Sequence, residues 1–354
     1  MKLLLIALLW VVLVVPMKAQ QVKVIAHRGA SSLAPENTLA AFKKAIDLGV
    51  DYLELDVWNT FDDSLIVIHD NTIERTTNGT GTVTAMYYFQ IARWDAGTWF
   101  SPQFKDERIP TLRQVLALMK EKNAKAAIEI KNTNITSNTV KLIEEMGMIG
   151  QVYICCFHID ALIEAKKINP QASTLLYVDP VTTALIDTVK SIGGSVIGSG
   201  NGNTQAAIDY AHLKGIEFWP WTIDDSLAMR SFIDKKVDAV ITNYPQVLLS
   251  ILNPTSVNNE TQSTLAPERF SISSYPNPFN ASSVIQYTIP KQSSVKIVVH
   301  DILGKNIATL VDERKQSAGS FSVSWNAYNV PSGIYFIRLH TEHGTATIKS
   351  LLIK

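Results

Sequence analysis

Short apolar runs alternate with stretches of helical apolar spacing over residues 21–252. Eight of the runs predict buried strands, at Val22–His27, Tyr52–Val57, Ala126–Lys131, Val152–Phe157, Ser173–Val178, Ser195–Gly198, Ile216–Thr222 and Ala239–Thr242. Helices are predicted between most of them, at Asn37–Leu48, Thr111–Glu121, Asp160–Ile168, Thr182–Ile192, Gln205–Lys214 and Asp225–Lys235. Strands that alternate with helices imply an α/β fold with a parallel sheet, and the count fits a (β/α)8 TIM barrel.

One further apolar run, Leu65–His69, breaks this alternation. The connection before it, Trp58–Ser64, is too short for a parallel crossover, so we expect the run to fold back as a hairpin. The hairpin would return His69 close to Glu54 and Asp56, at the end of the barrel where TIM barrels carry their active sites. The long link that follows, about residues 70–110, predicts a small insertion subdomain.

The composition changes after the predicted barrel. Residues 253–269 are polar and contain proline, which is typical of a linker. Residues 270–354 hold short alternating runs separated by turn residues, without a convincing helix. They predict a small all-β, immunoglobulin-like sandwich with strands at Val284–Ile289, Val295–Val299, Phe321–Trp325, Ile334–Leu339 and Thr345–Ile353.

Composition and charge exclude some classes of protein. The chain is 46% hydrophobic, which is ample for a buried core. Its 32 basic residues balance its 32 acidic residues and form no long basic run, so nucleic acid is not an expected partner. Cys155 and Cys156 are adjacent, and a disulfide between neighbours is strained, so we expect two free thiols.

The N-terminus is typical of an export signal. Lys2 precedes an apolar stretch, residues 3–15, that is shorter than the roughly 20 residues of a membrane-spanning helix. We expect a signal peptide over residues 1–19, no stable membrane span, and a mature protein that is extracellular or on the cell surface. An uncleaved N-terminal anchor is the alternative.

Three carboxylates fall on two predicted barrel strands. Glu54 and Asp56 are two residues apart, so both point to the same face of their strand, and Glu129 and Lys131 do the same on the next. Carboxylates gathered at the mouth of a barrel repel one another, and a bound cation resolves this repulsion. Oxygen ligands favour one hard divalent cation, Ca²⁺ or Mg²⁺. The alternative is an ordinary set of surface ion pairs.

Two histidines end predicted strands at the same mouth. His27 is followed by Arg28, and His69 is followed by Asp70. One imidazole can accept a proton while the other donates one, because the ordinary histidine pKa lies near neutral pH. Arg28 and Lys131 offer positive charge for the oxygens of a phosphate group. These residue types together are suited to cleavage of a phosphate ester.

Several sequence pieces occur in a characteristic order along residues 21–252: HRGASSLAPENTLAAF, DYLELDVWNTFDDSLIVIHD, ERTTNGTG, DAGTWFSPQFKDERIPTL, AIEIK, CCFH, FWPWTIDD and VDAVITNYPQ. In this order they resemble the glycerophosphodiester phosphodiesterase family. The resemblance implies a barrel with a small insertion, and cleavage of glycerophosphodiesters to sn-glycerol 3-phosphate and an alcohol.

The resemblance also implies roles for single residues. His27 and His69 would be the catalytic acid and base, and Trp221 would contact the glycerol moiety. The other implied residues are the metal ligands Glu54, Asp56 and Glu129 and the phosphate-binding residues Arg28 and Lys131. Two positions depart from the family's pattern: Asp224 stands where asparagine is frequent, and Asn243 where aspartate is frequent. We expect neither to contact the catalytic residues, and both to bear on substrate preference only.

The C-terminal segment has a resemblance of its own. YPNPFNASSVIQYTIP, VKIVVHDILGKNIATLV, AGSFSVSWNA, VPSGIYFIRL and the closing TATIKSLLIK resemble the type A sorting domain of the type IX secretion system. This implies the type IX secretion machinery as a partner. A generic sandwich module for adhesion or carbohydrate contact is the alternative.

The sequence thus predicts a secreted, metal-dependent phosphodiesterase that acts on glycerophosphodiesters. Either the glycerol 2-hydroxyl or a water molecule could attack the phosphorus, and the sequence leaves both routes open. The rival hypotheses are a related phosphodiesterase for phosphoinositide or sphingolipid head groups, and an inactive barrel that serves as a surface binding protein.

Overall fold

The computed structural model describes residues 21–200, 203–253 and 271–353, except 276, 278 and 281. The predicted export signal (1–19) and all of the predicted linker beyond Asn253 lie outside this range. Eight parallel strands within it form the barrel: β1 (Lys23–Ala26), β2 (Tyr52–Asn59), β4 (Ala126–Ile130), β5 (Val152–Cys156), β6 (Ser173–Tyr177), β7 (Val196–Ser199), β8 (Glu217–Pro220) and β9 (Ala239–Thr242). They pair in the order β8-β7-β6-β5-β4-β2-β1-β9. The barrel is nearly closed, because the amide of Asp238 donates to the carbonyl of Phe218 between its two end strands.

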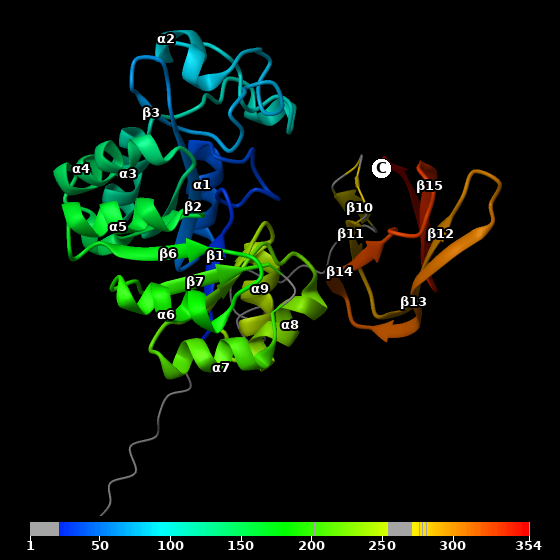
Figure 1. Ribbon diagram of the computed structural model, residues 1–354. Helices are drawn as coiled ribbons and strands as arrows, with labels where there is room; N and C mark the ends of the chain where they lie inside the picture. The colour runs from blue at the N-terminus through cyan, green and yellow to red at the C-terminus, as the bar shows by residue number, and fades with distance from the viewer. Residues whose placement is uncertain are drawn as a thin grey trace, which may run out of the picture.

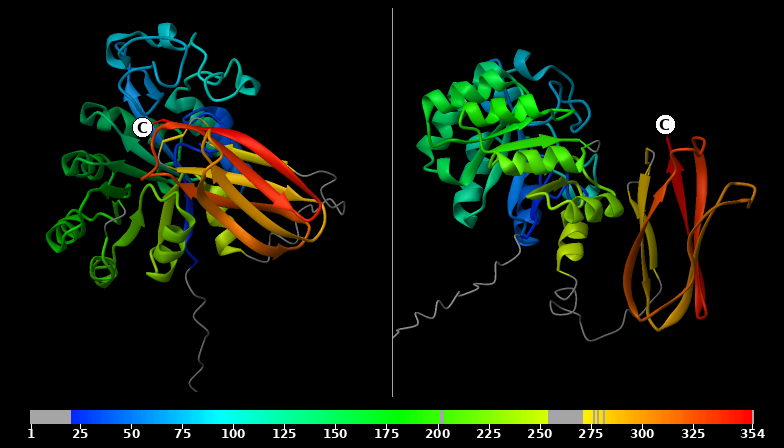
Figure 2. Two further views of the ribbon diagram at one scale, coloured as in Figure 1. Left: turned by 90° about the vertical axis from the view of Figure 1, so that its right-hand side faces the viewer. Right: turned by 60° about the horizontal axis from the view of Figure 1, so that its bottom comes forward.

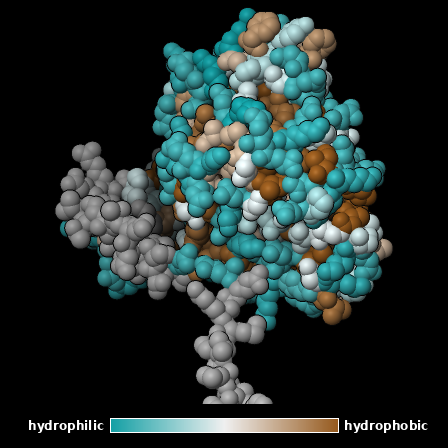
Figure 3. All heavy atoms as spheres, turned by 90° about the vertical axis from the view of Figure 1, so that its left-hand side faces the viewer, coloured by the Kyte–Doolittle hydropathy of each residue, from teal (hydrophilic) through white to brown (hydrophobic). Residues whose placement is uncertain are grey.

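Helices surround the barrel on the outside (Figures 1 and 2). They are α1 (Leu39–Asp47), α3 (Leu112–Lys122), α4 (Thr136–Glu145), α5 (Ile159–Ile168), α6 (Thr183–Ser191), α7 (Gln205–Leu213), α8 (Ser226–Asp234) and α9 (Pro245–Leu252), with short 3-10 turns at Thr133–Ile135 and Ile149–Gln151. Five of them begin after a side chain that accepts a hydrogen bond from the first turn, namely Thr38, Thr111, Thr182, Thr204 and Asp225. The face that lies to the left in Figure 1 is mostly hydrophilic, with separate hydrophobic patches (Figure 3). This fits helices that bury only one side.

Side chains alternate between two cores along each barrel strand. On β2, Leu53 and Leu55 belong to the large core between strands and helices. The lumen holds a second cluster, which includes Tyr177, Trp219 and Ile241. The two cysteines follow the same rule, because Cys155 belongs to the lumen and Cys156 to the outer core, and both are free thiols as predicted.

The predicted hairpin is present. Strand β3 (Leu65–Val67) pairs antiparallel with the end of β2, as Val57↔Val67 and Asn59↔Leu65. The insertion that follows contains the 3-10 turns η1 (Val83–Ala85) and η2 (Pro102–Phe104) and the short helix α2 (Tyr88–Ile91). The hairpin and the insertion share a core that is separate from those of the barrel, with Ile66, Ile68, Ile73, Val83, Ile91, Ala96 and Ile109 buried together.

The C-terminal residues form two antiparallel sheets. Their strands are β10 (Ser271–Tyr275), β11 (Ser282–Ile289), β12 (Ser293–His300), β13 (Asn306–Gln316), β14 (Gly319–Asn326), β15 (Gly333–Thr341) and β16 (Gly344–Leu352). The first sheet has the order β10-β11-β14 and the second β13-β12-β15-β16. A shared core joins them, in which the Trp325 ring of one sheet contacts the Tyr335 ring of the other at 5.3 Å. This confirms the predicted all-β fold. No helix among the described residues is long and apolar enough to cross a membrane.

Candidate active site

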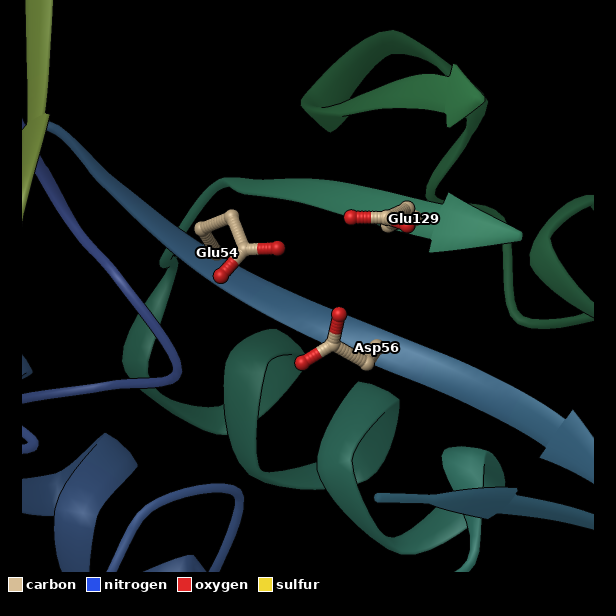
Figure 4. A group of neighbouring side chains, drawn as sticks. All are labelled: Glu54, Asp56 and Glu129. Carbon is tan, nitrogen blue, oxygen red and sulfur yellow. The ribbon is translucent and has the colours of Figure 1, made fainter. Parts of the chain in front are cut away.

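Three buried carboxylates meet at the carboxyl end of two neighbouring strands (Figure 4). Glu54 and Asp56 come from β2 and Glu129 from β4, where Asp56 pairs in register with Glu129. All three point into the lumen, because the residues between them on each strand pack against the outer helices. One oxygen of each carboxylate lies within 4.8 Å of the others. The predicted clustering of these three carboxylates is therefore confirmed.

Burial and mutual repulsion set the charge of this cluster. Burial raises the pKa of Glu54 well above its ordinary value, and the charges of Asp56 and Glu129 raise it further. Burial and the charge of Asp56 likewise raise the pKa of Glu129 to about 7. Burial also acts to raise the pKa of Asp56, but the positive charges of Lys131 and Arg28 lower it to about 2. With all three ionised, the carboxylates would carry one more negative charge than Lys131 and Arg28 can neutralise, and the raised pKa values of Glu54 and Glu129 oppose that state.

Lys131 and Arg28 are the cations nearest to the carboxylates. The Lys131 ammonium lies 2.8 Å from Glu129 and 3.3 Å from Asp56. The Arg28 Nε lies 3.5 Å from Asp56, and the Arg28 backbone amide donates to Glu54 at 2.8 Å. This amide points inward because Arg28 adopts a left-handed conformation, with φ of 57°.

The next residue makes this turn possible. Gly29 has φ of 81°, and a Cβ there would lie 2.8 Å from atoms of Ala41, so only glycine fits. The turn therefore brings the Arg28 side chain and backbone to the carboxylates from a strand next to theirs.

The donor set fits a hard divalent cation. All the ligand atoms are carboxylate oxygens, which Ca²⁺ and Mg²⁺ prefer. Burial, followed by the charges of neighbouring carboxylates, raises the pKa values of Glu54 and Glu129, and a cation between them would offset both effects. Glu54, Asp56 and Glu129 could therefore hold such an ion.

His27 directly follows β1, and its ring is held by Asn243, which is held in turn by Asp224. Its Nδ1 lies 2.8 Å from the Asn243 Oδ1, and the Asn243 amide donates to Asp224 at 2.7 Å. Because Asp224 only accepts, the Asn243 oxygen must face His27, whose Nδ1 then carries the proton and leaves Nε2 free. Nε2 lies 3.9 Å from Glu54. Burial, followed by the charge of Arg28, lowers the pKa of His27 to about 4.

This contact corrects one expectation from the sequence. Asn243 and Asp224 were expected to lie apart from the catalytic residues, but Asn243 bonds directly to His27. The reason is the barrel order, which places β9 beside β1 and so brings residues 216 positions apart together. The departures from the family pattern therefore bear on the orientation of His27.

His69 lies two residues beyond β3. The Ile68 amide donates to the Asp56 carbonyl, which brings His69 next to the carboxylate end of β2. Its Nδ1 lies 2.7 Å from the Asp70 Oδ1, so Nδ1 donates and Nε2 is again free. The Trp58 indole also donates to the His69 carbonyl at 3.0 Å.

Trp221 lies just past the end of β8. The centroid of its ring lies 5.5 Å from that of Phe157 and 5.7 Å from that of Tyr177, and the three rings form an aromatic wall at the mouth of the barrel. Among the described residues, nothing accepts a hydrogen bond from its buried indole Nε1. A buried donor without a partner is costly, so this atom is suited to meet an oxygen of a ligand.

Two further residues support the site and were not singled out from the sequence. Asn37 has φ of 58°, and its side-chain amide donates to Asp56 at 2.8 Å. Glu36 accepts from Arg28 at 2.9 Å. Both belong to the Pro-Glu-Asn triplet of the quoted N-terminal motif, where asparagine's tolerance of positive φ was the available signal.

Comparison with known proteins agrees with this geometry. The model of the glycerophosphoryl diester phosphodiesterase family matches residues 27–247. The chain belongs to this family. A glycerophosphodiester phosphodiesterase of Caldanaerobacter subterraneus is 37% identical over 239 residues, which cover 65% of this chain and 97% of that protein. The rivals named above, other phosphodiesterases and an inactive barrel, are thereby less favoured.

Solved structures of the family share the barrel. The crystal structure of a glycerophosphodiester phosphodiesterase from Agrobacterium tumefaciens is 30% identical, covers 65% of this chain and 99% of its own, and has a TM-score of 0.59. An Oleispira antarctica phosphodiesterase in complex with the product sn-glycerol-3-phosphate is 25% identical, with a TM-score of 0.62 and coverage of 66% and 97%.

The C-terminal residues match a second family model. The secretion system C-terminal sorting domain covers residues 273–354, in agreement with the resemblance to a type IX sorting domain. Such a tail implies export and a location at the cell surface or outside the cell.

Proposed function

We propose that this chain is a secreted, metal-dependent enzyme that hydrolyses glycerophosphodiesters to sn-glycerol 3-phosphate and an alcohol. The observation that carries the proposal is the meeting of three carboxylates, two cations and two histidines at one mouth of a barrel of this family. The product found with the Oleispira relative supports glycerol 3-phosphate as the common product.

In this proposal, Glu54, Asp56 and Glu129 hold one divalent cation, Ca²⁺ or Mg²⁺. When bound, the cation neutralises charge on the phosphate as it reacts. The guanidinium of Arg28 and the ammonium of Lys131 bind the remaining phosphate oxygens. The free indole N–H of Trp221 donates to a glycerol hydroxyl, which would give that buried donor its missing partner.

The two histidines move the protons. The free Nε2 of one accepts the proton of the attacking hydroxyl while its oxygen bonds to phosphorus. The bond between phosphorus and the leaving oxygen breaks, and the other histidine, which must enter this step as an imidazolium with both ring nitrogens protonated, gives its Nε2 proton to that oxygen. Asn243 and Asp70 keep each ring in the orientation this requires. The attacking hydroxyl belongs either to carbon 2 of the glycerol or to water. In the first route, water must then open the resulting cyclic phosphate, with the roles of the two histidines exchanged. A substrate without the 2-hydroxyl separates the two routes.

The test uses the full chain, stripped with a chelator and then supplied with Ca²⁺ or Mg²⁺. Release of sn-glycerol 3-phosphate from glycerophosphocholine is measured, with a Glu54→Gln variant as control. We expect turnover that returns with the cation and is lost in the variant. Turnover only on phosphoinositide or sphingolipid substrates would favour the rival phosphodiesterase. A folded protein that binds the cation but cleaves neither class would contradict the proposed chemistry.

We further propose that residues 1–19 form a cleaved export signal, that 21–252 form the enzyme, with an insertion at about 70–110, and that 253–269 link it to a sorting module, 270–354. The family match of residues 273–354 supports this division. In a host with a type IX system, the full chain should reach the cell surface or the medium. A chain that ends at residue 269 should remain in the periplasm, and equal export of both would contradict the proposal.

A further inference from the structure

Arg75 lies in the insertion and belongs to the ERTTNGTG motif, to which the proposed function gives no role. Its guanidinium makes three hydrogen bonds with two carboxylates. Both terminal nitrogens donate to Glu36 at 2.8 Å, and Nε donates to Asp70 at 2.6 Å. The planar guanidinium can hold two carboxylates at fixed angles, which a lysine ammonium cannot do.

Each of these carboxylates holds one residue of the candidate active site. Glu36 accepts from Arg28 at 2.9 Å and is only 13% exposed. Asp70 holds the Nδ1 of His69 at 2.7 Å. Arg75 therefore joins the residue proposed to bind phosphate to one of the histidines proposed to move a proton, across elements that lie 39 positions apart in the sequence.

The same bonds argue against direct contact between Arg75 and substrate. Nε and both terminal nitrogens already donate to carboxylates, and the charges of Glu36 and Asp70 offset its own. The hydrogen bonds that Arg75 donates to Glu36 raise the pKa of Arg75, so its guanidinium stays charged. Three of its five N–H groups are thus taken up by Glu36 and Asp70, and the contribution that these bonds support passes through the two carboxylates.

We propose that Arg75 is a positioning residue that fixes Arg28 through Glu36 and His69 through Asp70 at the same time. This inference rests on the proposed function, since it concerns the same site. Loss of Arg75 would release both side chains, although neither would be removed. Small displacements of groups that act on the reacting atoms cost roughly 10- to 100-fold in rate.

The experiment compares Arg75→Gln and Arg75→Lys with Arg113→Gln in the full chain. Arg113 is a matched control, because it donates two hydrogen bonds of 2.8 Å to the carboxylate of Glu145. Both residues lie on the outer helices, away from the site. We expect Arg75→Gln to lower kcat/KM for glycerophosphocholine roughly 10- to 100-fold, with a melting temperature like that of Arg113→Gln. Arg75→Lys should remain impaired, because charge alone does not restore the three bonds.

Single variants separate the contact of Arg75 with Glu36 from its contact with Asp70. Asp70→Asn should lower kcat, and Glu36→Gln should raise KM, whereas Arg75→Gln should do both. In the Arg75→Gln background, Asp70→Asn should add little further loss, since both changes break one connection. Full additivity of the two losses would overturn the proposal.

A readout without turnover keeps this inference separate from the proposed function. In ¹⁵N-histidine NMR spectra, the wild type and Arg113→Gln should show a single His69 tautomer with a protonated Nδ1. Arg75→Gln should show averaged ring signals. Should the wild type cleave no glycerophosphodiester, the proposed function fails and these spectra alone decide the role of Arg75. If Arg75→Gln does not fold, Arg75→Lys carries the same measurements. Activity and spectra like those of Arg113→Gln would overturn the inference.

Discussion

At the carboxyl end of the barrel strands, three buried carboxylates face two cations, whereas at the amino end one carboxylate is fully satisfied. There, Glu217 accepts from Lys23 at 2.8 and 2.9 Å and from the Trp219 indole at 2.8 Å. The rings of Tyr52, Tyr153 and Trp219 pack together beneath it, at 4.8 to 5.6 Å. One barrel thus concentrates repulsion and unpartnered donors at one end and packing at the other. We infer that the first end is shaped for a ligand and the second for stability.

The largest expected effect is on catalysis at the carboxyl end. His27→Ala and His69→Ala should each lower kcat for glycerophosphocholine roughly 10²- to 10⁴-fold, because each removes a proposed acid or base. Neither ring belongs to the hydrophobic cores, so the melting temperature should change little. Steady-state kinetics and thermal unfolding of the same preparations provide the check. Full activity in either variant would remove that histidine from the mechanism.

The carboxylates at the carboxyl end of the barrel could be predicted from the sequence, but the residue that orients His27 could not. Alternation along β2 and β4 was enough to place Glu54, Asp56 and Glu129 on one face, since the strand period is two. The bond between His27 and Asn243 depends instead on closure of the barrel, which sets β9 beside β1. Local pattern contains no information on which distant loops meet there.

Missed elements have equally local causes. Helix α4 begins with Thr136 and other residues of low helix propensity, and its buried face includes the polar residues Thr136 and Thr139, so its apolar spacing is weak. Helix α9 is short and almost wholly apolar, so few polar residues mark its exposed side. Strand β13 lies at the edge of its sheet and mixes charged and apolar residues, so alternation is weak. The eight barrel strands were predictable because both of their faces are buried.

The amino end should show the next largest effect, on stability. Trp219 is fully buried, and Trp219→Ala removes its packing with Tyr52 and Tyr153 and its bond to Glu217. The free energy of unfolding should fall by about 3 to 5 kcal/mol. The protein that remains folded should keep its kcat. Denaturant unfolding measures the first value, and a fall in kcat comparable to that of His27→Ala would show that the two ends are not independent.

A pH-dependent effect separates the carboxyl end from ordinary packing. The pKa of Glu129 is raised from 4.5 to about 7, first by burial and then by Asp56. The native state therefore keeps a proton that the unfolded state has released, so this contribution to stability is present below pH 4.5 and lost as the pH rises to about 7. The loss is on the order of 3 kcal/mol.

His27 acts in the opposite direction over part of this range, since burial lowers its pKa from 6.5 to about 4. The informative quantity is thus the difference between Glu129→Gln and the wild type, both in chelator. The stability of the variant relative to the wild type should increase between pH 4.5 and 7. If the difference in unfolding free energy between the variant and the wild type stays constant with pH, the pKa of Glu129 is not raised in the native state.

The smallest effect is expected from Lys23→Met at the amino end. Lys23 and Glu217 are 25% and 31% exposed, so water screens their attraction, and Glu217 keeps its bond from Trp219. The free energy of unfolding should fall by no more than about 1 kcal/mol, with kcat unchanged.

The same substitution at Lys131, which is 14% exposed between Asp56 and Glu129, should cost more, because it leaves buried carboxylates without their cation. Equal losses from the two substitutions, measured in chelator, would contradict the contrast between a satisfied end and a strained one. A larger loss at Lys131 that added cation reverses would tie the strain to the proposed metal site.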